Sequence, residues 1–137
     1  MVHALRQARR VLNDGGYLLD LRPAPVHRHV GIEHSGSVEH LAVMKEDFGD
    51  DYAANQAVKE LLGSGELVMK RRIRFDCTRR MDRFSDFETW LDEYVRLGKI
   101  RSHEWLLSKV SETLKSRRVI TKIVVRGPVD LRVLVKR

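Results

Sequence analysis

The chain has 137 residues, 42% of them hydrophobic and 33% charged, with a formal net charge of +7. This length and composition exclude a disordered chain and predict one globular domain over residues 1–137. No apolar run reaches the roughly 18 to 20 residues of a membrane span, and the single cysteine, Cys77, excludes an intramolecular disulfide. Because the N-terminus also lacks the pattern of a secretory signal, we expect a cytoplasmic protein that does not associate with membranes.

The first predicted element is an amphipathic helix over Met1–Leu12, with Val2, Leu5 and Val11 on its apolar side. The segment 13–16 (NDGG) ends this helix, because glycine takes the left-handed conformation past a helix end without steric cost. A short apolar strand, Tyr17–Leu21, follows.

This helix, turn and strand resemble the segment that follows the fourth strand of class I S-adenosylmethionine-dependent methyltransferases. The matching residues are Ala4-Leu5-Arg6, Arg10-Val11-Leu12, Gly15-Gly16 and Tyr17-Leu18, whereas Asn13-Asp14 replaces the commoner Lys-Pro. In that family the cofactor-binding half precedes this segment, so the resemblance implies a chain that lacks it. The sequence also lacks a glycine-rich turn between a strand and a helix, which such a cofactor site needs. We therefore expect no cofactor, no catalytic residues and no enzymatic activity.

A β-hairpin is predicted next, from Val26–Glu33 through a turn at Ser35-Gly36 to Ser37–Met44. A two-residue turn places His40 opposite Gly31 and close to His29, on the strand face that His27 also occupies. Three imidazoles on one face could bind zinc or copper. Histidines of exposed hairpins are usually only polar surface residues, however, so we expect no metal, with His27, His29 and His40 as the candidate ligands.

The remaining elements follow from helical periodicity, alternation and capping residues. They are a helix over Tyr52–Leu62 capped by Asp50 or Asp51, a strand over Leu67–Cys77, a helix capped by Ser85 that reaches Leu97, a helix over His103–Ser116 capped by Ser102, and a closing hairpin of Val119–Arg126 and Val129–Val135 around Gly127-Pro128.

The Leu67–Cys77 strand has the clearest alternation of side chains. Leu67, Met69, Ile73, Phe75 and Cys77 are predicted to face the core, with Cys77 as a small buried hydrophobic residue. The intervening Val68, Lys70, Arg72, Arg74 and Asp76 then face the other way.

The order of elements lacks strict strand–helix–strand alternation and predicts an α+β fold with a mixed, largely antiparallel sheet, in which β-hairpins pack against about four helices. The methyltransferase resemblance implies the C-terminal half of a Rossmann-like domain. In that half the fifth strand is followed by a helix, a sixth strand, and a seventh strand that runs antiparallel between those two.

The same resemblance implies that the strand Tyr17–Leu21 has lost its usual neighbour. An unpaired apolar edge favours pairing with another chain, and leaving apolar surface wet would cost several kcal/mol. We therefore expect a homo-oligomer, with a dimer favoured, whose interface contains Val2, Leu5, Tyr17, Leu19 and Leu21. A separate cofactor-binding subunit is the other possible protein partner. The predicted function is a noncatalytic module for self-association or small-ligand binding.

The alternative is a basic nucleic-acid-binding protein. The cationic residues Lys70, Arg72, Arg74, Arg79, Arg80 and Arg83 could track phosphates. That region has no exposed aromatic residues for base stacking. Whether these cations share one surface or are neutralised by Asp86, Asp92 and Glu93 decides between the two functions.

Overall fold

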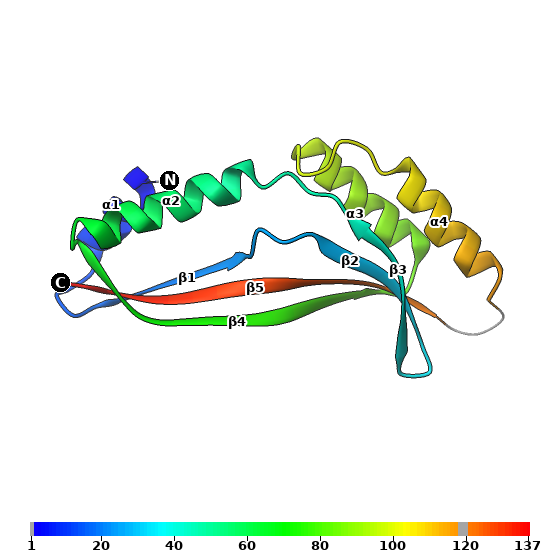
Figure 1. Ribbon diagram of the computed structural model, residues 1–137, viewed down its shortest axis with the longest axis horizontal. Helices are drawn as coiled ribbons and strands as arrows, with labels where there is room; N and C mark the ends of the chain where they lie inside the picture. Colours follow the sequence, from blue (N-terminus) through cyan, green and yellow to red (C-terminus); the bar gives the residue numbers. More distant parts are fainter. Residues whose placement is uncertain (1, 118–120) are drawn as a thin grey trace. The chain divides into compact units, whose positions relative to one another are not determined.

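The computed structural model describes residues 2–117 and 121–137 and has an α+β fold with an antiparallel sheet (Figure 1). Within these residues the elements are α1 (Val2–Val11), β1 (Tyr17–Pro23), β2 (Arg28–His34), β3 (Ser37–Met44), α2 (Gly49–Gly63), β4 (Leu67–Met81), α3 (Phe84–Arg96), α4 (Glu104–Lys115) and β5 (Lys122–Lys136). Contacts group them into two compact units: unit 1 comprises Met1–Pro25, Phe48–Phe75 and Pro128–Arg137, and unit 2 comprises Val26–Asp47 and Asp76–Gly127.

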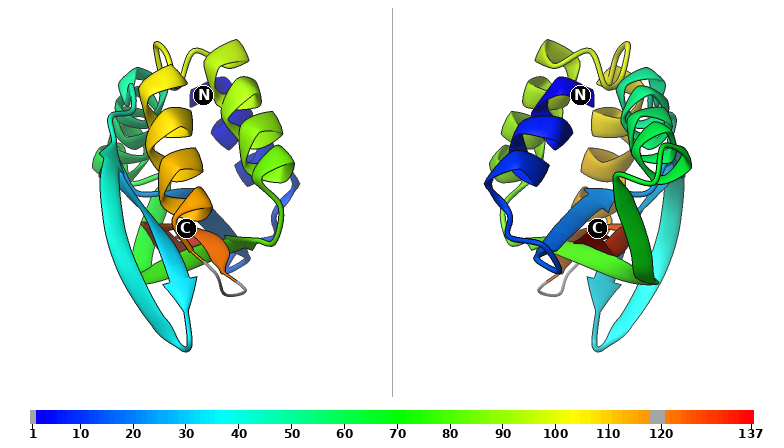
Figure 2. Two further views of the ribbon diagram at one scale, coloured as in Figure 1. Left: turned by 90° about the vertical axis from the view of Figure 1, so that its right-hand side faces the viewer. Right: turned by 90° about the vertical axis from the view of Figure 1, so that its left-hand side faces the viewer.

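Unit 1 is a three-stranded sheet with two helices on one side. The strand order is β1-β5-β4, and β1 pairs antiparallel with β5 from Tyr17↔Val135 to Pro23↔Val129. The helices α1 and α2 lie on the same side of β1 (Figure 2, right). Its apolar cluster is small: Val58, Leu61, Leu67 and Leu134 are buried, with Leu5, Leu18 and Leu62 packed against them.

Unit 2 contains the β2–β3 hairpin, the adjoining parts of β4 and β5, and the helices α3 and α4 (Figure 2, left). The turn is at Ser35-Gly36 and His40 pairs with Gly31, so the predicted hairpin and its register next to the turn are confirmed. The first strand begins at Arg28 rather than Val26, and the register shifts between Val30 and Gly31. β2 also pairs with β5 from His29↔Arg126 to Glu33↔Lys122. The core is continuous and apolar; Val30, Ile32, Phe87, Leu91, Leu106, Val110, Ile123 and Val125 are all at most 3% exposed.

The predicted closing hairpin is wrong, because β5 is one strand that includes Gly127-Pro128. The β1 ladder on β5 ends at Val129 and the β2 ladder begins at Arg126, so the missing N–H of Pro128 falls between two ladders. A Cβ on Gly127 would lie 2.7 Å from the Arg28 side chain, so the glycine allows a close approach rather than a turn. Residues 118–120, where the expected strand begins, lie outside the described residues.

The predicted inward face of β4 is also partly wrong. Leu67 is buried, but Phe75 is 44% exposed and Cys77 is exposed. Arg72 and Arg74 instead project toward the α2 side, where both bind Asp130. The buried carboxylate of Asp130 therefore holds both arginines on the helix side of the sheet, where the alternation had placed apolar residues.

The predicted helix caps are wrong at three places. α2 follows Phe48, α3 follows Arg83 and α4 follows His103, and none of these residues makes a side-chain capping hydrogen bond. The helices therefore begin one to three residues away from the predicted caps. None of the helices in the described residues is long and apolar enough to cross a membrane.

Candidate functional site

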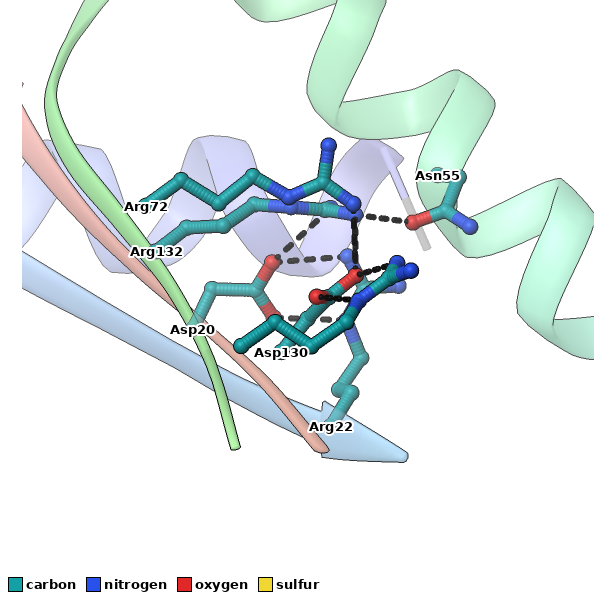
Figure 3. Close-up of polar contacts among 7 residues, drawn as sticks. Asp20, Arg22, Asn55, Arg72, Asp130 and Arg132 are labelled. Carbon is teal, nitrogen blue, oxygen red and sulfur yellow. Dashed lines mark hydrogen bonds and ion pairs between the residues drawn. The ribbon is translucent and has the colours of Figure 1, made fainter. Parts of the chain in front are cut away.

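A cluster of charged side chains lies between the sheet of unit 1 and α2 (Figure 3). It is built on a short pattern that occurs twice in the chain, Asp-Leu-Arg at residues 20–22 of β1 and at residues 130–132 of β5. The antiparallel register places Asp20 opposite Arg132 and Arg22 opposite Asp130. Opposite charges directly across two strands attract, so the pairing is favourable.

Asp130 is the most strongly bound carboxylate of the cluster and is only 3% exposed. Arg74 donates from Nε (2.8 Å) and Nη2 (3.0 Å), and Arg72 donates from Nη2 (2.7 Å). The hydrogen bonds from Arg74, reinforced by those from Arg72, hold the pKa of Asp130 far below its usual value even though burial alone would raise it. The carboxylate therefore remains ionised at neutral pH.

Arg132 is the buried cation of the cluster, at 7% exposed. Its Nη2 donates to Oδ1 of Asn55 on α2 (2.5 Å), and its Nη1 donates to Asp20 (3.3 Å). Asp20 is also held by two hydrogen bonds from Arg22, at 2.6 and 2.7 Å. Burial, with a contribution from the nearby Arg22 charge, lowers the pKa of the Arg132 guanidinium.

The cluster contains more positive than negative side chains. The cluster holds four guanidinium groups, on Arg22, Arg72, Arg74 and Arg132, and two carboxylates, on Asp20 and Asp130. Four positive and two negative charges leave an excess of two positive charges beneath α2. A further anion would therefore be attracted to this place.

A cavity of about 450 Å³ opens beside this excess charge. Arg72 and Arg132 line it from the strands, and Asn55, Gln56 and Lys59 line it from α2. Its remaining walls are Tyr52, Val58, Leu62 and Met69. The size lies within the range of small-molecule sites, and polar groups on an apolar background are typical of them.

The opposite face of the same sheet is apolar and uncovered; we call it the uncovered face. Because side chains alternate along a strand, Tyr17, Leu19 and Leu21 point away from the side on which Asp20 and Arg132 meet α2. They are 65%, 65% and 60% exposed. Their partners on β5, Val135, Val133 and Leu131, share this face, and no helix of unit 1 covers it within the described residues.

The predicted interface residues separate into two groups. Tyr17, Leu19 and Leu21 are available on the uncovered face, whereas Leu5 packs against the apolar cluster of its own unit and Val2 is half-buried. The helix α1 therefore packs against the sheet of its own unit.

The predicted nucleic-acid residues fall in both units and are partly neutralised. Arg72 and Arg74 bind Asp130, and Arg80 binds Glu33 through Nε (2.8 Å) and Nη2 (3.1 Å). Two of the three acids expected to neutralise them have other partners, since Glu93 binds Arg96 and Asp92 contacts His103. Lys70, Arg79 and Arg83 are exposed.

The predicted histidine cluster forms only as a pair. His29 and His40 have ring centroids 5.0 Å apart, whereas His27 precedes β2 and its Nδ1 accepts a hydrogen bond from the backbone N–H of Glu46 (3.0 Å). No group of three or more metal-ligating side chains occurs in the described part of the chain.

Sequence reasoning missed Asp20, Arg22, Asn55, Asp130 and Arg132. The repeated Asp-Leu-Arg pattern was the available signal, because an acid and a base two residues apart share one face of a strand. Asn55 carries no such signal, since only the packing of α2 on the sheet brings it to Arg132. No family model, curated protein or solved structure matches the chain, so the roles of these sites rest on their own geometry.

Proposed function

We propose that this chain is a noncatalytic, methyltransferase-like interaction module that associates with a second copy of itself through the uncovered face. The observation that carries the proposal is the exposure of Tyr17, Leu19 and Leu21 on one face of one strand. Large contiguous apolar surface of this kind is typical of interaction sites. The strand order β1-β5-β4, with β5 in the middle, is the order that the methyltransferase resemblance implies and supports that part of the proposal.

A second copy fits this surface better than a charged partner. The side chains that β1 and β5 contribute to the uncovered face, Tyr17 to Leu21 and Leu131 to Val135 in alternation, include no charged residue. A contact in which the uncovered faces of two copies pack on each other has two-fold symmetry, which uses one surface twice.

The expected affinity follows from the exposed side chains. Complete burial of a large apolar side chain stabilises by about 1.5 to 3 kcal/mol, so three residues that are about two-thirds exposed contribute about 1 to 2 kcal/mol each. Two copies together would gain about 6 to 12 kcal/mol, and association costs about 4 to 15 kcal/mol. We therefore expect a dimer that dissociates on dilution.

The test is light scattering after size-exclusion chromatography over a range of protein concentrations. The unmodified chain should be dimeric at high concentration, and Leu19→Arg should be monomeric at every concentration. Leu97→Arg is the matched control, because Leu97 is 53% exposed and lies in unit 2. A chain that is monomeric throughout, or a control that dissociates equally, would contradict the proposal.

The noncatalytic part of the proposal needs its own measurement. Calorimetric titration with S-adenosylmethionine should give no binding at micromolar concentration. Specific binding in that range would contradict it.

Nucleic-acid binding is the second candidate function. Lys70, Arg79 and Arg83 are exposed, and in the described part of the chain no carboxylate forms an ion pair with any of them. Binding of this kind depends on phosphate contacts and weakens steeply with salt. A fluorescent oligonucleotide titrated at 50 and 200 mM salt would reveal it, and the absence of binding at the lower concentration would reject it.

We also propose the cytoplasm as the location of the protein. The sequence supports this with its single cysteine, which is exposed in the structure. Disulfides are typical of oxidising compartments.

A further inference from the structure

We propose that the cavity of unit 1 lined by Arg72 and Arg132 binds a small organic anion, one that carries a single carboxylate or phosphate group on a compact apolar body. The proposal is independent of self-association, because the cavity lies on the α2 side of the sheet and the uncovered face is its opposite side. Of its polar residues, only Arg72 was a candidate from the sequence, and there for nucleic acid rather than for a small anion.

The charge of the cavity selects an anion. Its lining includes three cationic side chains, Arg72, Lys59 and Arg132, and no carboxylate. The nearby carboxylates Asp20 and Asp130 are already occupied by arginines, and the cluster retains two excess positive charges. A larger hollow of about 700 Å³ in unit 2 differs in this respect, since Glu46 and Asp47 line it beside Lys45 and Arg101.

The two arginines are held in place before any ligand arrives. Asn55 and Asp20 fix two different nitrogens of Arg132, and Asp130 fixes Nη2 of Arg72. In Figure 3 the two guanidinium groups lie near one another, with their ends directed toward Asn55 on α2. In the described part of the chain Arg72 uses only that one nitrogen, so its other N–H groups remain to donate to an oxyanion.

The rest of the cavity fits an apolar body. Val58, Leu62 and Met69 supply aliphatic surface, and Tyr52 adds an exposed aromatic ring. Gln56 and Lys59 complete the rim from α2. A volume of about 450 Å³ is that of a small-molecule site, and the ligand class that we propose is a small anion.

The test uses phenyl phosphate as the probe, because it combines one phosphate with one ring. Isothermal titration calorimetry with the full chain should show saturable binding at one site per chain, weaker binding of inorganic phosphate, and no binding of benzylamine. Benzoate distinguishes the two anion types, since tighter binding of benzoate than of phenyl phosphate would assign the site to carboxylates. Absence of saturable binding for both anions, or equal binding of benzylamine, would overturn the proposal.

Matched variants locate the binding. Arg72→Gln should weaken phenyl phosphate binding by about tenfold or more, the usual effect of losing a charged hydrogen bond. Arg71→Gln removes a neighbouring charge on the same strand that does not line the cavity, and it should stay within about threefold of the unmodified chain. Equal weakening by the two variants would indicate diffuse attraction and overturn the proposal.

A second pair of variants avoids the charge cluster in case Arg72→Gln does not fold. Gln56→Glu keeps the shape of an exposed side chain on α2 but places a carboxylate on the cavity wall. It should weaken phenyl phosphate binding by about tenfold. Gln7→Glu makes the same change on an exposed position of α1 outside the cavity and should have no effect. Equal effects of the two would contradict the assignment.

Discussion

The two units bury different kinds of residue between sheet and helices. Unit 2 has a continuous apolar core that includes Val30, Phe87 and Leu91, each inaccessible to solvent. Unit 1 has a small apolar cluster around Leu61 and Leu134, and beside it the charged residues Asp130 and Arg132 are almost as deeply buried. Apolar burial contributes directly to stability, whereas a buried ion pair contributes little net energy and is strongly destabilising when one partner is lost. Unit 1 therefore contains the buried charges, and both proposed binding surfaces lie in it.

Within unit 1 the two faces of the sheet invert the usual pattern at the charged cluster, while Leu18 and Leu134 keep part of the helix side apolar. The face toward α2 carries Asp20, Arg72 and Asp130, while the face away from the helices carries Leu19 and Leu21. A sheet that packs helices on one face normally has apolar residues on that face and polar residues on the other. The inversion makes one face a candidate ligand site and the other a candidate contact between copies.

The largest expected loss of stability comes from a substitution in the core of unit 2. Phe87→Ala should lower the free energy of unfolding by about 3 to 5 kcal/mol, because Phe87 is fully buried and its ring stacks on Trp90, with centroids 6.1 Å apart. Urea unfolding followed by tryptophan fluorescence measures it, since Trp90 and Trp105 both lie in unit 2. Phe75→Ala in unit 1, at a residue 44% exposed, should cost clearly less. Equal losses would mean that Phe87 contributes no more to the fold than a half-exposed phenylalanine.

The next largest loss of stability is expected from a substitution in the charged cluster of unit 1. Asp130→Asn keeps the shape but removes the charge that holds Arg72 and Arg74, and we expect a loss of about 2 to 3 kcal/mol. The value lies below that of a fully buried pair because both arginine side chains are half exposed. The control is Asp76→Asn, whose partner Arg126 is exposed, with an expected loss of about 0 to 1 kcal/mol. Urea unfolding followed by far-ultraviolet circular dichroism compares the two, and equal losses would contradict the role of Asp130.

The pH dependence of stability provides a second test of the role of Asp130. The pKa of Asp130 is lower in the folded chain than in the unfolded chain, so its ionised form stabilises the fold above the unfolded value of about 3.9. That contribution is lost as pH falls through the folded pKa. The stability difference between the unmodified chain and Asp130→Asn should stay constant from pH 7 to pH 5 and shrink below about pH 4. Urea unfolding at pH 7, 5, 4 and 3 measures it, and a constant difference at every pH would contradict the expected titration.

The sequence predicts unit 2 better than unit 1, for a physical reason. Alternation and turn chemistry act locally, so the β2–β3 hairpin and the pairing of His40 with Gly31 follow from the residues themselves. Asp130 reverses the expected orientation of β4 by binding Arg72 and Arg74, which are 58 and 56 residues away. Alternation in β4 alone contains no information about that partner. The turn predicted at Gly127-Pro128 was wrong for a similar reason. Glycine and proline suit both a turn and the gap between two strand ladders, so the residue types alone do not distinguish the two.

The smallest expected effect concerns the uncovered face of a single chain. In dilute solution Leu21→Ala should change the free energy of unfolding by about 0.5 kcal/mol or less, because Leu21 is 60% exposed. Leu134→Ala, on the paired strand but fully buried, should cost about 2 to 5 kcal/mol.

The same pair of variants then tests whether a second copy covers Leu21. An association that buries this face stabilises the folded chain by mass action, so the stability of the unmodified chain should rise with protein concentration. The loss caused by Leu21→Ala should therefore grow with concentration, and the loss caused by Leu134→Ala should grow much less, because its side chain is already buried in the single chain. Unfolding curves at several concentrations measure both, and a Leu21→Ala effect that stays near zero throughout would show that water, rather than a second copy, is what this face meets.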